Sequence, residues 1–396
     1  MKAKKNLIWG SLVVALGVVL TGCSPNQQEL FNAAMKMQNV TSIQQHTAMT
    51  FKLTGSGFEP DVQQQVDTAA MFLNNAKLDL ETKTSGNDQK TVGKSQVTMN
   101  LALQGMDINV PIWVDSDLSG DTPKVTEIIK LPQIAKTSFP QQYASKEYMV
   151  MNPFNMNKSE LDMTKLIDFS KNFQASEVQF LTSYSKRFNS NVDTAANSTE
   201  SIQTNDGIKL VRSYEIRLND AQFKDFIRYT VNNVVQDKEA LNFAKGFMDS
   251  MLEMTQTPDQ AKSLSELDQA FKDFDVNKQT EFLAKFNNVM DQLKDVTLLG
   301  DKGIELKYFI YNGYFIRESG TINFKVDLAQ MNKFMDTLNG RQSSETAKGT
   351  LDMVVNFNTD NSGINDPLEI QIPVVNDTNS FDYMEFIKNI TSKAKN

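Results

Sequence analysis

The sequence predicts an α+β protein built around an antiparallel β-sheet, and three patterns lead to this expectation. Residues 97–104 alternate strictly between apolar and polar side chains, as a strand does when one face of its sheet lies on a core. Asn312-Gly313 joins two apolar runs and favours a two-residue hairpin turn, because both residues tolerate positive φ. Through residues 264–293, apolar side chains recur at steps of three and four, which is the spacing of one face of a helix.

The expected elements form two β-rich regions around a helical middle of about residues 160–294. In the first region, short strands are expected at residues 50–53, 77–82, 97–104, 109–114, 125–131 and 148–151. The middle is expected to hold helices at residues 220–235, 238–254 and 264–293, the last as an antiparallel pair, and one strand at 208–218. The second region holds the hairpin, strands at 322–328 and 351–357, and a closing helix at 381–390. No Pro/Gly/Ser-rich linker divides these elements, so a single body is expected.

The Asn-Gly hairpin carries apolar side chains on both of its faces. A two-residue turn is expected to pair Tyr311 with Tyr314, and further along to pair Phe309 with Ile316 and Lys307 with Glu318. A strand exposed to water on one side alternates, so something is expected to cover the second face. The segment 264–293 is the natural candidate, and an imperfect fit between its helices and the sheet would leave a pocket. The residues expected to line this pocket are Phe309, Tyr311, Tyr314, Ile316, Phe286 and Met290.

The first 23 residues are typical of an exported lipoprotein. Three lysines precede an apolar stretch at residues 7–20, which is too short to span the ~30 Å hydrocarbon core of a membrane. Leu20-Thr21-Gly22-Cys23 then resembles a lipobox, which implies cleavage before Cys23 and attachment of a diacylglycerol to its thiol. Cys23 is the only cysteine in the 396 residues, so an internal disulfide is excluded.

This interpretation divides the chain into a signal peptide at residues 1–22, a lipidated N-terminus with a short polar tether at 23–29, and one body at 30–396. The protein is expected on the outer face of the cytoplasmic membrane, held there by its lipid, as on a Gram-positive cell surface. Removing the signal peptide removes three lysines and no acid, which leaves 37 Lys and Arg against 48 Asp and Glu, a net charge of −11. Such an excess of acid disfavours a nucleic-acid partner, whose binding depends on cationic side chains.

Signatures of catalysis are scarce in this sequence. His46 is the only histidine, so a histidine-rich metal site is excluded and a Ser-His-Asp triad would depend on this one residue. Neither Gly-x-Gly-x-x-Gly nor a phosphate-binding Gly-Lys-Ser/Thr loop occurs. The carboxylates are many, but no pair stands apart from the rest by position. The sequence therefore predicts a protein that is not an enzyme and that needs no cofactor.

An acidic loop after residue 114 is the one weak candidate for a metal site. Its oxygen-bearing side chains occur at alternate positions before and after Gly120, as at the opening of a calcium loop. The twelfth position is Thr126, with Glu127 one residue late, and strands rather than helices flank the loop. A polar β-turn is the favoured interpretation, and a weak calcium site is the alternative. The candidate ligands are Asp115, Asp117, Ser119 and Asp121.

Several segments resemble a class of Gram-positive surface lipoproteins, whose motifs are family labels and not known active-site residues. The segments that carry the resemblance are Phe31–Gln38, Trp113–Pro123, Lys146–Met151, Phe226–Val231 and Leu298–Gly303. Proteins similar to these can carry a further stalk module of the kind named after the copper amine oxidase N-terminal domain. The resemblance implies the fold of lipoprotein carriers and mycobacterial LppX-like proteins. That fold is a strongly curved antiparallel half-barrel, here of about eleven strands, with helices packed on its concave face.

Two functions follow as expectations. The first is non-catalytic binding of a hydrophobic or lipid-like ligand between sheet and helices, with the many Met and Phe side chains either filling the core or lining the cavity. The second is a structural or interaction module of the cell envelope that binds a partner protein or a wall polymer.

Overall fold

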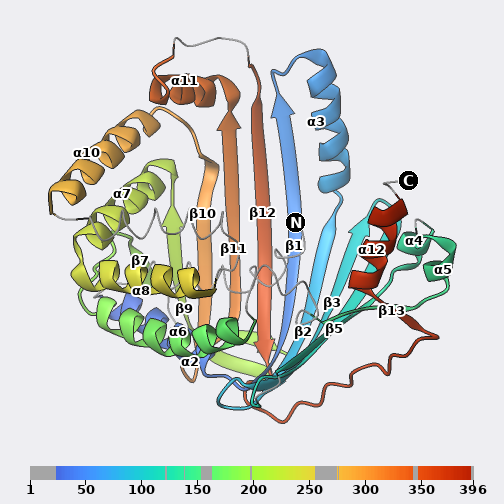
Figure 1. The fold of residues 1–396 in the computed structure, drawn as a ribbon. Helices are drawn as coiled ribbons and strands as arrows, with labels where there is room; N and C mark the ends of the chain where they lie inside the picture. The colour runs from blue at the N-terminus through green and yellow to red at the C-terminus, as the bar shows by residue number, and fades with distance from the viewer. Residues whose placement is uncertain are drawn as a thin grey trace.

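The chain folds around one large β-sheet that is curved, open and mostly antiparallel (Figure 1). The computed structural model describes residues 24–120, 123–137, 139–152, 163–196, 199–254, 274, 276–341 and 347–393. Within these ranges the sheet has thirteen strands and ten helices accompany it. The expected α+β class with an antiparallel sheet is therefore confirmed.

The strand order is β13-β6-β5-β4-β3-β2-β1-β12-β11-β10-β9-β7, and β8 pairs with β9 outside this path. The strands are β1 Ser42–Ser56, β2 Lys77–Gly86, β3 Val92–Leu103, β4 Met106–Asp117, β5 Lys124–Lys130, β6 Tyr148–Met151, β7 Thr194–Ala196, β8 Glu200–Thr204, β9 Gly207–Leu218, β10 Leu299–Tyr311, β11 Tyr314–Asp327, β12 Thr350–Ser362 and β13 Ser380–Asp382. Only the pairing of β13 with β6 is parallel among those described. Because β1 pairs with β12 along thirteen residues of each strand, the two β-rich regions of the sequence form one sheet.

The helices gather at the two sides and the upper end of the sheet, as Figure 1 shows. They are α2 Pro25–Gln38, α3 Pro60–Leu73, α4 Gln133–Lys136, α5 Gln141–Ala144, α6 Met163–Tyr184, α7 Asp220–Gln236, α8 Lys238–Met254, α10 Val276–Leu293, α11 Leu328–Leu338 and α12 Tyr383–Lys393. The helices α2, α6, α7 and α8 lie beside β9 and β10, whereas α4, α5 and α12 lie beside β5 and β6. The described helices α7, α8 and α12 agree with the expected ones, and α10 is the second half of the pair expected at 264–293.

The expected polar tether at residues 23–29 is wrong from Ser24 onward, because these residues begin a packed helix. Gln27 N–H donates to the Ser24 hydroxyl and Ser24 N–H donates to the Gln27 side chain, both at 3.3 Å, which is a capping box. The Gln27 side chain is itself buried and donates to Ser190 and to the Val192 carbonyl at 2.9 and 2.8 Å. The short polar run that resembled a tether is the capped first turn of α2.

The helix α3 was not expected from the sequence. Its apolar side chains do follow helical spacing after Pro60, which is a favoured first residue of a helix. Val66 lies against Gly55 of β1, where a Cβ atom would come within 2.4 Å of the valine side chain. The absence of a side chain at Gly55 therefore lets α3 fold back along β1.

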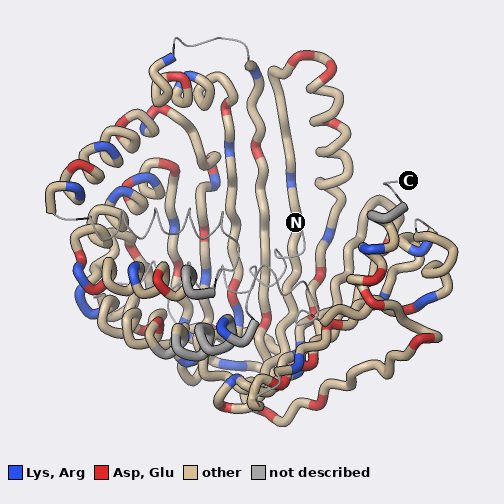
Figure 2. The backbone as a smooth tube through the Cα atoms, in the orientation of Figure 1, with Lys and Arg blue, Asp and Glu red and all other residues tan. Residues whose placement is uncertain are grey.

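Charged residues of both signs are interspersed along the described helices and strands (Figure 2). None of the described helices is both long and apolar enough to cross a membrane.

Candidate functional site

One face of the sheet is apolar across its central strands, and we call it the inner face. Residues directly opposed in an antiparallel ladder project to the same side, so the register assigns each residue to a face. The row through Phe357 of β12 continues through Met49, Leu78, Leu101 and Ile108 on β1 to β4. The neighbouring rows add Phe51, Leu53, Leu80, Met99, Val110, Ile322, Leu351, Met353 and Val355. An unbroken apolar surface thus crosses at least six strands.

The opposite face, which we call the outer face, is polar on the same strands. Its residues include Thr50, Lys52, Asp79, Glu81, Asn100, Asn109, Asp352 and Asn356. A sheet with one apolar and one polar face is built to meet water on one side and an apolar layer on the other.

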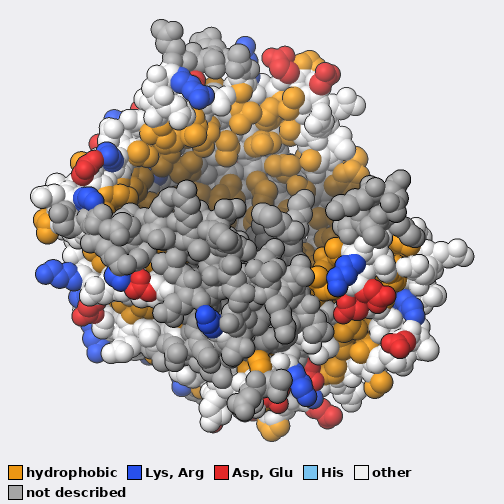
Figure 3. All heavy atoms as spheres, viewed as in Figure 1, with side chains coloured by type: hydrophobic (Ala, Val, Ile, Leu, Met, Phe, Trp, Pro, Cys, Tyr) orange, Lys and Arg blue, Asp and Glu red, His pale blue; other side chains and the backbone are white. Residues whose placement is uncertain are grey.

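The inner face is only partly covered. Its side chains on β1 to β4 are half-buried, and Phe324 of β11 is 46% exposed. Figure 3 shows hydrophobic side chains gathered around a hollow in the upper half of the view. The helices α3 and α11 stand at this end of the sheet and carry exposed apolar residues, among them Met71, Phe72 and Met335. An apolar surface of this extent marks an interaction or ligand site in soluble proteins.

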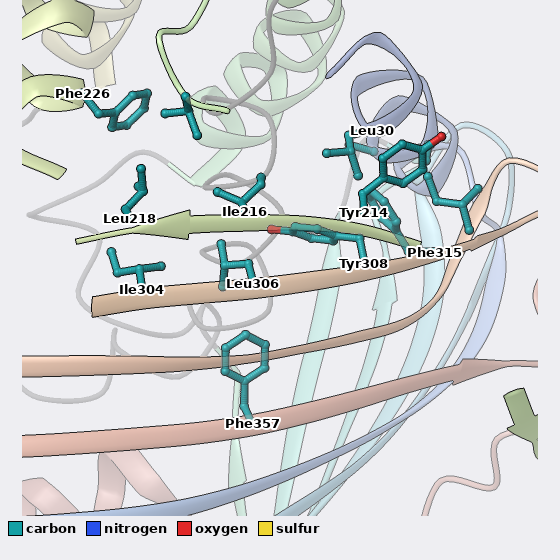
Figure 4. Close-up of a cluster of buried hydrophobic side chains, with 14 of the residues drawn as sticks. Leu30, Tyr214, Ile216, Leu218, Phe226, Ile304, Leu306, Tyr308, Phe315 and Phe357 are labelled. Atoms are coloured by element: carbon teal, nitrogen blue, oxygen red, sulfur yellow. The ribbon is translucent and has the colours of Figure 1, made fainter. Parts of the chain in front are cut away.

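Helices α2 and α7 close the inner face over β9 and β10. Leu30 of α2 and Phe226 of α7 belong to one buried cluster with Ile216, Leu306 and Tyr308 of the sheet (Figure 4). The structure therefore separates a close-packed side of the inner face from the half-buried apolar surface over β1 to β4.

A β-bulge in the hairpin decides which face Glu318 occupies. Tyr311 pairs with Tyr314 across the turn, as expected. The register then shifts by one residue, so Glu318 lies opposite Tyr308 and not opposite Lys307. The expected Lys307–Glu318 pair is wrong, because one extra residue on a strand moves every later side chain to the other face. Glu318 consequently projects from the inner face.

Glu318 and Tyr308 are polar residues buried among the apolar side chains of the inner face. Glu318 is 5% exposed, and burial raises the pKa of its carboxyl to about 7, with a hydrogen bond from Asn361 opposing the shift. Tyr308 is 2% exposed, and burial, with a contribution from nearby Glu318, raises the pKa of its hydroxyl above the ordinary value. Within the described ranges that hydroxyl makes no hydrogen bond. Buried polar groups are nearly always hydrogen-bonded, so this pair is the unusual feature of the inner face.

Phe309 and Ile316 lie on the outer face, in a buried cluster with Ile202 of β8 and Val211 of β9. The two residues share this cluster, but the bulge makes Phe309 directly opposed to Arg317, so the expected Phe309–Ile316 ladder pair is wrong. The second face of the hairpin is thus covered by β8, with Tyr311 and Ile364 packed against the same cluster. The expectation that segment 264–293 supplies this cover is wrong for its described part, because α10 packs against α7 and α11.

Tyr311, Tyr314 and Ile316 line a recess of about 180 Å³ on this side of the molecule. The Lys36 ammonium lies 4.1 Å from the centre of the Tyr314 ring, and that of Lys209 lies 5.2 Å from the centre of the Tyr311 ring. Asp206 and Asp366 contribute carboxylates to the wall of the recess. Three of the six residues expected to bind a ligand therefore meet in one recess, whose lining combines apolar and polar side chains.

Phe286 and Met290 lie apart from the hairpin residues. Both belong to α10, which lies near the upper end of β10 in Figure 1, whereas the hairpin turn is at the lower end. Met290 is buried and the Phe286 ring stacks on Phe282, with centroids 6.3 Å apart. The structure does not bring the six residues into one site.

The acidic loop after β4 is a hydrogen-bonded turn in its described part. Asp117 accepts hydrogen bonds from the amide and the hydroxyl of Ser119 at 3.0 and 2.6 Å, and these bonds lower the pKa of Asp117. Asp115 lies within β4 opposite Thr126, and Asp121 lies outside the described residues. Among the residues that the structure describes, no three His, Cys, Asp or Glu side chains lie close enough to share a metal ion. Cys23 and the signal peptide also lie outside the described ranges.

The inner-face residues were not identified as a site from the sequence, although their signal was present. The alternation of residues 97–104 and 351–357 is visible in the sequence and assigns the members of each strand to one face. What joins these faces into one surface is the pairing of distant strands, which periodicity does not reveal.

Comparisons with protein-family models, with curated proteins and with solved structures each find no match to this chain.

Proposed function

We propose that this protein binds a hydrophobic or lipid-like ligand against the inner face of its sheet and that it catalyses no reaction. The observation that carries the proposal is the continuous apolar surface of β1 to β4, β11 and β12, most of whose side chains are only half-buried. Leaving that much apolar surface in water is costly, at roughly 25 cal/mol per Å². A ligand that covers it would remove this cost.

The finer description of the fold belongs to this proposal. We regard the sheet as a half-barrel of the lipoprotein-carrier kind, with its concave side as the ligand wall. Its curvature, its open edges and its single apolar face support this description. Lipidation of Cys23 would hold the body on the outer face of the cytoplasmic membrane, within reach of lipid. The lipobox-like ending of residues 20–23 supports this placement.

A non-catalytic role is consistent with the position of His46. The imidazole lies on the outer face, 3.3 Å from the Asp79 carboxylate, and both side chains are more than 40% exposed. A polar pair in this setting is an ordinary surface contact.

Native mass spectrometry of the purified full-length protein tests the proposal. We expect one or a few lipid-sized molecules to remain bound under gentle ionisation. Phe51→Gln introduces a polar side chain on the inner face and is expected to reduce the bound fraction severalfold. Its matched control is Thr50→Gln, one residue away on the exposed outer face, which is expected to retain the ligand. Equal retention in both variants, or no bound lipid in the unmodified protein, would contradict the proposal.

The second candidate is an interaction module of the cell envelope that binds a wall polymer or a partner protein. The recess at Tyr311 and Tyr314 favours it, because aromatic faces beside carboxylates and amides suit a sugar unit. Titration with soluble wall fragments separates the two candidates. Binding that is lost in Tyr311→Ala and kept in Phe51→Gln would support the interaction module.

A further inference from the structure

On β12 and β1, the inner face changes from apolar to polar along the strand. From Phe357 toward the upper end of β12, the inner-face residues are Val355, Met353 and Leu351. In the other direction they are Thr359 and Asn361. These two strands in the middle of the sheet therefore have a polar end, which lies nearer the hairpin turn.

Glu318 and Tyr308 lie at this transition. The row through them continues to Thr359 and Thr47, whose hydroxyls are 2.9 Å apart. In the next row, Gln45 donates to Asn361 at 2.9 Å, and Asn361 supplies the hydrogen bond to Glu318. The hydroxyls and amides here bond to one another or to the backbone, whereas the Tyr308 hydroxyl makes no hydrogen bond within the described residues.

We propose that Glu318 and Tyr308 bind the polar end of an amine-bearing, single-chain amphiphile, whose hydrocarbon chain lies along the inner face toward α3 and α11. This inference rests on the proposed lipid-binding function and names the class of lipid and its orientation.

The placement of the neighbouring charges indicates that Glu318 would bind a cationic group of the ligand. Lys307 and Arg317, which flank Glu318 in the ladder and in the sequence, project to the outer face. There they pair with Glu200 at 3.0 Å and with Asp360 at 2.5 Å. Lys36 donates instead to the Asn312 carbonyl at 2.8 Å. Within the described part of the chain, no ion pair is formed by Glu318. A buried carboxylate is costly without a cation or several hydrogen bonds, and a ligand ammonium would supply both charge and donors.

The length of the apolar surface suits one hydrocarbon chain. Eight residue steps separate Glu318 from Val326 at the end of β11, which is roughly 26 Å of strand. One leaflet accounts for about half of the ~30 Å hydrocarbon core of a bilayer. A hydrocarbon chain of membrane-lipid length is thus shorter than the stretch of β11 between the polar pair and the rim.

Displacement of a chain-only fluorescent probe, a pyrene-labelled alkane, tests this assignment on the purified full-length protein at pH 8. The competitors are dodecylamine, dodecanol and dodecanoic acid, each below its micellar concentration. We expect dodecylamine to bind on the order of 10- to 100-fold more tightly than dodecanol, and dodecanoic acid to bind most weakly. Glu318→Gln should abolish the preference for the amine, and Tyr308→Phe should weaken amine binding about fivefold.

Glu81→Gln is the matched control, because it makes the same chemical change on the outer face and should leave the preference intact. Equal affinities for amine and alcohol in the unmodified protein, or an unchanged preference in Glu318→Gln, would overturn the inference while the bound alkane still supported lipid binding. Failure of the alkane itself to bind would overturn the proposed function. Circular dichroism of each variant identifies any that do not fold, and the alkane reports whether the apolar surface is intact.

Discussion

Lys307 of β10 pairs with Glu200 of β8, with 3.0 Å between the ammonium and the carboxylate. A hairpin without a bulge would have placed Glu318 opposite this lysine. The bulge instead turns Glu318 to the inner face, where its cross-strand neighbour is Tyr308. One extra residue thus exchanges a surface ion pair for a buried acid, and the consequences can be measured.

The stability of the protein is expected to fall as the pH rises from about 4.5 to about 7, because of Glu318. Folding raises the pKa of this carboxyl from 4.5 to about 7, so the folded state holds its proton more tightly than the unfolded state. The group costs nothing below the unfolded pKa, and the cost reaches roughly 3 kcal/mol above the folded pKa. Urea unfolding of the wild type and of Glu318→Gln at pH 4.5, 6 and 8 should show the variant gaining stability relative to the wild type as the pH rises. A difference that stays constant with pH, or one that Glu81→Gln reproduces, would contradict this assignment.

Asp220→Asn is expected to destabilise the protein by about 3 kcal/mol, because it leaves the buried Lys224 without its partner. Asp220 accepts hydrogen bonds from the Leu298 and Leu299 amides, both at 2.8 Å, and forms an ion pair with Lys224. Burial opposes ionisation, but the bonds from Lys224 and from these amides hold the pKa of Asp220 below its ordinary value. Urea unfolding at pH 7 measures the loss.

The exposed i,i+4 pair of Glu281 and Lys285 provides the control for that experiment. Glu281→Gln removes the acid of an exposed pair and should leave the stability nearly unchanged, because water screens such pairs. Similar losses in the two variants would mean that the Asp220–Lys224 pair does not join α7 to the start of β10.

Phe309→Ala and Phe51→Ala are expected to distinguish a side chain that stabilises the fold from one that contacts the ligand. Phe309 is 6% exposed within its outer-face cluster, so its truncation should cost about 3–5 kcal/mol and leave lipid retention unchanged. Phe51 is half-buried on the inner face, so its truncation should cost about 1 kcal/mol and lower lipid retention. Thermal unfolding and native mass spectrometry give the two readouts. The opposite pattern would place the ligand at the hairpin cluster and not at the inner face.

Cys23→Ala is expected to abolish metabolic labelling with a radioactive fatty acid. The variant should accumulate as an uncleaved precursor or appear in the medium, because a lipobox cysteine is both the lipid acceptor and the residue after the cut. Labelling and membrane fractionation in a Gram-positive host provide the measurement. A variant that remains membrane-bound and is processed at the same site would show that the anchor lies elsewhere.

Local patterns of residues predicted the class of the fold and the faces of several strands. Alternation in residues 97–104 and 351–357 assigned side chains to faces, and Asn312-Gly313 located the hairpin turn and its Tyr311–Tyr314 pair. These features depend on local backbone geometry, which is determined by a short stretch of residues.

How those faces combine depends on contacts between residues that are far apart in the sequence. The pairing of β1 with β12 joins residues about 300 positions apart, and β8, not the described part of segment 264–293, covers the outer face of the hairpin. The bulge near Ile316 placed Glu318 against Tyr308. Each outcome depends on which distant segments compete for the same apolar surface, and a one-residue change of register reverses the face of every later side chain. Four of the six predicted ligand residues lie on the hairpin, whereas the apolar surface proposed to bind the ligand is formed only by the pairing of distant strands.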